Sequence, residues 1–147
     1  MMLEDSRKQR YKKKLEKLES YQHLFRKWFE SYKSNQLNKG ENFEKIFAIY
    51  HSIQLIIEVI TDIVGMMVKD LSLIVEDNYS NFEKLLNREI ISSDLFQGLK
   101  NLNGLRNRIV HDYNGIIDEV VWDSIEENEP YIEEFKEMVR KWLIQKG

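Results

Sequence analysis

The amino-acid sequence predicts an all-α protein, a single domain over residues 1–147 in which four long helices and one short helix form an up-down bundle. Apolar residues recur at steps of three and four along most of the chain, and no stretch alternates as a strand would. Hydrophobic residues make up 42% and charged residues 32%, which is typical of a soluble domain with a charged surface.

The first helix is predicted over residues 3–33. One apolar stripe follows it, while its charged residues lie elsewhere. The stripe consists of Tyr11, Leu15, Leu18, Tyr21, Phe25, Trp28 and Tyr32. The polar segment 34–40 breaks this pattern, so we expect a loop there.

The second helix is predicted over residues 42–77 and has the widest apolar face. Its core positions are Phe43, Phe47, Tyr50, Ile53, Ile57, Ile60, Val64, Met67, Leu71 and Ile74. So wide a face predicts a central helix, with room for a second subunit on one side. Glu58 and Asp62 lie four residues apart on the narrow polar stripe. They are either solvated or meet a cation from another helix.

Capping patterns mark the next two helices. Ser80 and Glu83 have the spacing of a capping box, which predicts a short helix to about Arg88. The segment 92–94 (Ser-Ser-Asp) then caps a fourth helix that runs toward Tyr113, and Asn114–Gly115 is predicted to end it, with Gly115 free to take a positive φ.

The last helix opens at Asp118 and carries an apolar stripe toward the C-terminus. Pro130, the only proline, either kinks this helix or begins a new one near Asn128.

Several kinds of site are not expected. The chain has no cysteine, its three histidines lack metal-ligand spacing, and its six glycines form no phosphate-binding loop. We therefore predict no metal and no cofactor. The acidic start does not resemble a signal peptide, and charges interrupt the apolar window 53–75, so a cytoplasmic protein without a membrane span is expected.

Charge is unevenly distributed over a chain of net charge −3. The cations that crowd the N-terminal end are Arg7, Lys8, Arg10, Lys12, Lys13 and Lys14, while acidic residues crowd the C-terminal end. The basic cluster is either a solvated helix start or a surface that attracts phosphate backbones.

Arg106 stands out on the fourth helix. On a helical wheel with 100° per residue and Leu102 placed at zero, the predicted buried face of this helix spans about −60° to +80°. It comprises Leu95, Leu99, Leu105, Ile109, Val110 and Tyr113. Arg106 falls inside it at about 40°, whereas Asn107 falls at about 140° and His111 near 180°. A charge on an apolar stripe is costly unless it is paired, and Glu58 or Asp62 is the natural partner of Arg106.

The wheel also separates Arg106 from His111. A site that uses both needs a distorted helix end or a second copy of the helix across a dimer axis. The residue pattern is equally consistent with purely structural roles: Arg106 as a structural ion pair, His111 as a surface residue and Tyr113 as part of the core.

A resemblance bears on this choice. Arg106, four further residues and then His111-Asp112-Tyr113 resemble the Arg-x4-His-x-Tyr signature of the HEPN superfamily. The Arg106-Asn107 pair and the His-Asp-Tyr run are similar in particular to HepT-like toxins of prokaryotic toxin–antitoxin pairs. The likeness covers about residues 40–145 and fits the first helix more loosely.

The resemblance implies a HEPN-like fold and a metal-independent endoribonuclease, or an inactive relative, with a composite site at a homodimer cleft. Arg106 would bind the scissile phosphate of RNA, and His111 would act as general acid or base. Asn107, and more loosely Glu58 or Asp62, would support them. Tyr113 matches the position at which a minimal nucleotidyltransferase antitoxin attaches AMP in some members.

The rival hypothesis is a non-catalytic helical module that binds a nucleotidyltransferase, a nucleotide or RNA. In that case Arg106 serves only as an anchor or as a core ion pair.

Overall fold

The computed structural model describes residues 2–34, 39–112 and 115–146, in which every regular element is a helix. The helices are α1 (Asp5–Ser34), α2 (Lys39–Asp70), α3 (Asn78–Asn87), α4 (Ser93–His111) and α5 (Asp118–Gln145). The predicted all-α fold with four long helices and one short helix is therefore confirmed.

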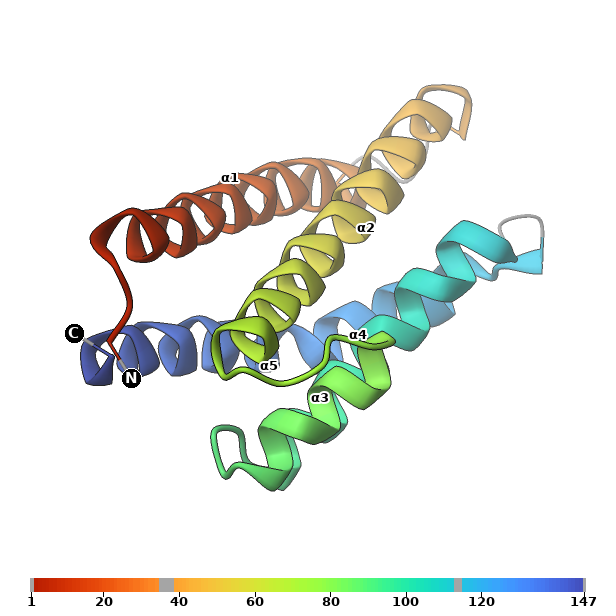
Figure 1. The fold of residues 1–147 in the computed structure, drawn as a ribbon. Coiled ribbons are helices and arrows are strands. Elements are labelled where there is room, and N and C mark those ends of the chain that lie inside the picture. Colours follow the sequence, from red (N-terminus) through yellow and green to blue (C-terminus); the bar gives the residue numbers. More distant parts are fainter. Residues whose placement is uncertain (1, 35–38, 113–114, 147) are drawn as a thin grey trace.

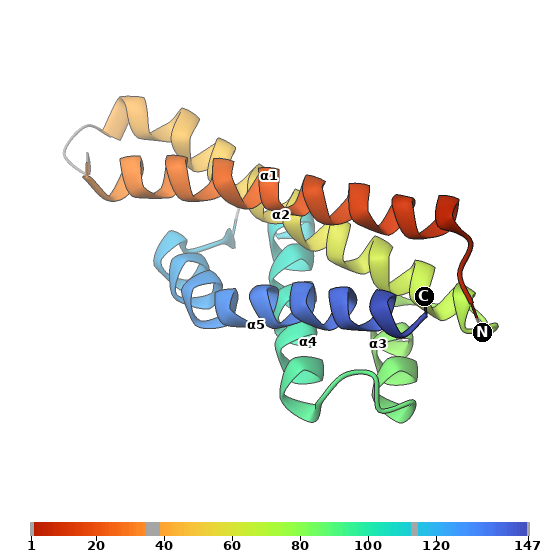
Figure 2. The same ribbon diagram turned by 90° about the vertical axis from the view of Figure 1, so that its left-hand side faces the viewer.

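The helices form two antiparallel hairpins and a closing helix (Figure 1). α1 and α2 make the long hairpin, and α3 and α4 make the short one, which Figure 2 shows set across the direction of the others. α5 returns along the bundle, so that the two ends of the chain meet: the amide of Leu3 donates to the carbonyl of Lys146 at 3.2 Å. All five helices thus enclose one core.

α2 is the central helix, packed against α1, α3 and α4. Its side chains with at most 1% exposure include Ile49, Ile53, Ile56, Ile57, Ile60, Ile63, Val64, Met67 and Val68. Residues Phe43–Asp70 are long and apolar enough to cross a membrane, but half of that apolar window is buried inside the fold. The apolar character of α2 is accounted for by its place in the core.

The predicted boundary of α2 is wrong at its C-terminal end. The helix stops at Asp70, because Ser72 takes φ 61° and the amides of Leu73 and Ser72 donate back to the carbonyls of Val68 and Lys69. This is a Schellman ending built without glycine. Ile74, predicted on the apolar stripe, consequently lies outside the helix and is 76% exposed.

The start of α2 also departs from the prediction. Phe43 and Phe47 were expected in the core but are 64% and 51% exposed. The periodic pattern identifies one face of a helix, but it does not tell how far along that face other elements extend.

The cap of α3 differs as well. Asp77, not Ser80, is the N-cap, and its carboxylate accepts from the backbone amide of Ser80 at 2.9 Å. This hydrogen bond, with a second from the Ser80 hydroxyl, lowers the pKa of Asp77. The predicted capping box fails because α3 begins at Asn78, so that Ser80 lies inside the first turn and its hydroxyl donates to the carboxylate of Asp77.

α5 is one helix from Asp118 to Gln145 with Pro130 inside it. Proline has no amide hydrogen to donate to the carbonyl of Glu126, and in Figure 2 the first turns of α5 lie at an angle to the rest. Of the two predicted alternatives, the kinked helix is the one observed.

A polar contact fixes α1 to the end of α2. Arg7 Nε lies 2.8 Å from Asp70 Oδ2, and the hydroxyl of Tyr11 donates to the same carboxylate at 2.5 Å. Burial and this hydrogen bond raise the pKa of Tyr11, so that its hydroxyl stays protonated and donates. The contact sets the register in which α1 lies along α2.

Candidate functional site

α4 positions the residues singled out by the sequence. Ser92 caps the helix, as predicted, with its hydroxyl accepting from the amide of Leu95 at 3.0 Å. Leu105 and Ile109 are buried and hold the last turns against the core. The helix therefore presents Arg106, partly exposed, and His111, exposed, on two different flanks.

The end of α4 differs from the prediction. The last helical residue is His111, and Asp112 is the C-cap, its amide donating to the carbonyl of Arg108 at 2.9 Å. Gly115 does not take a positive φ. Val110, expected on the buried face, is 37% exposed because the final turn of α4 extends beyond the core.

Arg106 is held by a carboxylate of α2. Its Nη2 lies 3.0 Å from Glu58 Oε1, and its Nη1 donates to Asn107 Oδ1 at 3.3 Å. Gln54 Nε2 donates to the same Glu58 oxygen at 3.1 Å. The side chains of Arg106 and Glu58 are 27% and 34% exposed, so the pair lies at the surface and a ligand can reach the guanidinium.

Asp62, the other proposed partner, does not pair with Arg106. It accepts from Lys14 of α1, at 3.2 Å between Nζ and Oδ2. Residue spacing could not predict which carboxylate pairs with Arg106, because Glu58 and Asp62 lie one turn apart on the same face. α1 and α4 both pack against α2. Lys14 of α1 pairs with Asp62, and Arg106 of α4 pairs with Glu58.

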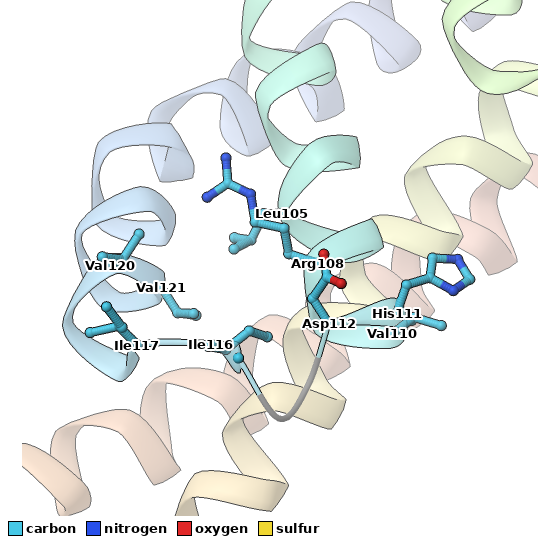
Figure 3. Close-up of a pocket in the computed structure, with 10 residues that line it drawn as sticks. Leu105, Arg108, Val110, His111, Asp112, Ile116, Ile117, Val120 and Val121 are labelled. Atoms are coloured by element: carbon cyan, nitrogen blue, oxygen red, sulfur yellow. The ribbon is translucent and has the colours of Figure 1, made fainter.

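His111 lies in a different setting. It borders a depression of about 710 Å³ between the end of α4 and the start of α5. The other described lining residues are Leu105, Arg108, Val110, Asp112, Gly115, Ile116, Ile117, Val120 and Val121. Figure 3 shows Arg108 reaching toward α5 while His111 extends to the opposite side. Arg106 does not line this depression, and no hydrogen bond joins it to His111.

Arg108, an exposed residue near the end of α4, also lines this depression and was not among the predicted site residues. Tyr113 lies outside the described residues, so its proposed role stays a prediction. Within the described ranges, no three His, Asp or Glu side chains are grouped so as to hold a metal ion.

The chain can thus offer an accessible guanidinium and an accessible imidazole five residues apart on one helix. The first can bind an anion such as a phosphate, and the second can accept or donate a proton. Within one subunit the two groups face different surfaces.

Comparisons with known proteins agree in family and in fold. The family described as "Ribonuclease HepT-like" matches residues 11–139. A protein of Archaeoglobus fulgidus named "Putative RNase" is 41% identical over 99 residues, which span 67% of this chain and 75% of that protein.

Two solved structures share the fold. One is a tri-AMPylated HEPN toxin of Shewanella oneidensis in complex with an MNT antitoxin, with a TM-score of 0.78, 18% identity, and coverage of 89% of this chain and 96% of that one. The other is YutE, a cytosolic protein of unknown function from Bacillus subtilis, with a TM-score of 0.77, 17% identity, and coverage of 97% and 93%. The predicted HEPN-like architecture is confirmed.

Proposed function

The chain belongs to the HepT-like ribonuclease family, and on that premise we propose that it is the toxin of a toxin–antitoxin pair, a metal-independent endoribonuclease of the cytoplasm. One observation carries the proposal: Arg106 and His111 stand at the family spacing on α4, and the side chains of both reach the solvent. An RNA phosphate can therefore approach each of them.

The chemistry follows from these two groups. Cleavage without a metal begins when the ribose 2′-hydroxyl attacks the adjacent phosphate and expels the 5′-oxygen of the next nucleotide. His111 takes the proton from the 2′-hydroxyl or gives one to the leaving oxygen. Arg106 binds the phosphate and stabilises the charge that develops on its oxygens. Glu58 and Asn107 hold the guanidinium in place, while Asp62, one turn along α2, pairs with Lys14 of α1.

The site is completed by a second subunit. Arg106 and His111 lie on different flanks of α4, so a two-fold axis near the helix end would bring His111 of one copy to Arg106 of the other. Exposed apolar residues around the depression that His111 borders support such an axis: Val110 is 37%, Ile117 63% and Val120 48% exposed. A homodimer would cover them and form a composite cleft.

The antitoxin is a minimal nucleotidyltransferase that attaches AMP to Tyr113. The fold neighbour from Shewanella oneidensis, an AMPylated toxin bound to an MNT antitoxin, supports this partner. Tyr113 follows His111 by two residues. An added phosphate there would occupy the anion site at Arg106 and exclude RNA.

Purified protein tests the proposed activity. We expect it to cleave RNA in the presence of excess EDTA, and Arg106→Gln to slow cleavage by about 10²- to 10³-fold, because a charge-stabilising donor is lost. The partly exposed Arg106–Glu58 pair contributes roughly 1 kcal/mol or less to stability, so urea unfolding should barely change.

A non-catalytic binding module is the second candidate, favoured by the engagement of Arg106 with Glu58. It predicts that wild-type protein leaves RNA intact and that Arg106→Gln affects only the binding of a partner. Cleavage by the wild type that Arg106→Gln leaves undiminished would refute the role given to Arg106.

Tyr113→Phe should prevent modification without removing the ring. When the toxin is produced together with the nucleotidyltransferase, the intact mass of the wild type should rise by one or more AMP groups, while the Phe variant should keep its unmodified mass. Its growth arrest should then persist in the presence of the antitoxin. AMP on the Phe variant would place the modification on another residue.

A further inference from the structure

Four cations line one flank of α1. Arg10, Lys13, Lys14 and Lys17 occupy positions i, i+3, i+4 and i+7, which places them within about 100° of one another on the helix. We call them the cationic stripe. The stripe borders the buried face of α1, which includes Tyr11 and Leu18.

The stripe is largely uncompensated. Arg10, Lys13 and Lys17 are exposed, and within the described part of the chain they form no ion pair; only Lys14 is paired, with Asp62. The acidic residues of α1 project from its other sides: Glu19, for example, pairs with Arg140 of α5. The flank therefore carries a local positive charge on a protein whose net charge is −3.

The stripe is continuous with the candidate site. Lys14 contacts Asp62, and one turn earlier on α2, about 6 Å along the axis, Glu58 contacts Arg106. In Figure 1 α2 lies between α1 and α4, so the outer strip of α2 joins the two cationic groups. A polyanion bound at Arg106 can cross this strip and reach the stripe.

We propose that the cationic stripe binds the backbone of the RNA whose scissile phosphate lies at Arg106. The inference rests on the proposed function and adds the path of the substrate. Phosphate contacts require accessible cations and little else. A membrane-binding helix or the centre of a protein–protein interface needs exposed apolar residues. Between Arg10 and Lys17 this flank presents only cations, which favours a nucleic-acid backbone over either of those partners.

A matched pair of variants tests the path. Lys13→Gln/Lys17→Gln removes two charges from the stripe. Lys8→Gln/Lys12→Gln removes the same two charges at the same spacing from the opposite flank, where both lysines border a groove with Glu16 and Glu19. The probe is a fluorescent single-stranded 2′-O-methyl RNA, which lacks the attacking hydroxyl and cannot be cleaved during titration.

We expect the stripe variant to bind this probe roughly 10- to 30-fold more weakly near 0.1 M salt. The slope of log affinity against log salt should fall by about 1.4, because each lost contact to a single strand accounts for roughly 0.7. The control pair should keep the wild-type slope. Circular dichroism of both variants verifies that α1 is still folded.

Equal losses in both pairs would overturn the inference, since net charge alone would then explain binding. Unchanged RNA binding with loss of nucleotidyltransferase binding would also overturn it and assign the stripe to a protein partner. If wild-type protein cleaves unmodified RNA while the stripe variant binds normally, the inference fails and the proposed function stands. If the wild type neither binds nor cleaves RNA, both fail.

Discussion

Replacing His111 by Ala is expected to slow RNA cleavage by about 10²- to 10⁴-fold, the usual contribution of a positioned general acid or base. The fold should be unaffected, because His111 is exposed and forms no side-chain hydrogen bond with the residues that the structure describes. Single-turnover cleavage by purified protein measures the effect. In cells that lack the antitoxin, the same substitution should abolish growth arrest.

His23→Ala is the matched control. His23 is also exposed but lies on α1, in a separate surface hollow with Arg26 and Glu30. This variant should cleave RNA at the wild-type rate. Undiminished growth arrest by the His111→Ala protein would rule out the catalytic role.

Mixing inactive variants tests the composite site. In a dimer that combines Arg106→Ala with His111→Ala, one cleft has lost both groups and the other retains both. Random pairing should then restore about one site in four, because half of the dimers are mixed. Sites built within single subunits would regain nothing, so the mixture separates the two geometries without a structure of the dimer.

The fold was largely predictable because helix faces are encoded locally. The apolar repeats and the capping patterns together predicted all five helices, and the serine at position 92 correctly marked the start of α4. The predictions that failed were those of helix ends and caps. α2 ends in a Schellman motif with Ser72 in place of glycine, and Asp77 outcompetes Ser80 as the cap of α3. Each depends on backbone hydrogen bonds that residue patterns describe only on average.

The sequence predicted individual contacts of the candidate site, but not how its residues are arranged relative to one another. The misplaced charge on the apolar stripe indicated an ion pair with α2, and Glu58 provides it. The choice of Glu58 over Asp62 depended on where α1 lies, because Lys14 takes the second carboxylate. In the proposed composite site, the approach of His111 to Arg106 would depend on a second chain, for which a single sequence holds no direct signal.

The largest stability effect is expected at Gly98, where α4 crosses α5. A Cβ placed there would lie 2.3 Å from Cγ, 2.5 Å from Cδ2 and 2.8 Å from Cβ of Tyr131. Rotation of the tyrosine ring cannot relieve the contact with its own Cβ, so the helices must separate. We expect Gly98→Ala to lower the free energy of unfolding by about 2 kcal/mol, measured by urea denaturation.

Gly104→Ala on the same helix is the control. The nearest atom to its added Cβ is the Tyr79 hydroxyl oxygen at 3.9 Å, so the substitution should stabilise the protein by about 0.5–1 kcal/mol through helix propensity alone. If both alanines prove equally stable, the close approach of α4 and α5 at Gly98 is wrong.

A double-mutant cycle isolates the cause of the Gly98 effect. Tyr131→Ala removes the two ring atoms nearest the new methyl group, so Gly98→Ala should cost less in that background than in the wild type, by about 1 kcal/mol. Because α4 carries Arg106 and His111, Gly98→Ala should also reduce RNA cleavage in protein that remains folded, and Tyr131→Ala should restore part of it. Recovery of stability without recovery of cleavage would show that the position of α4 against α5 does not control the site.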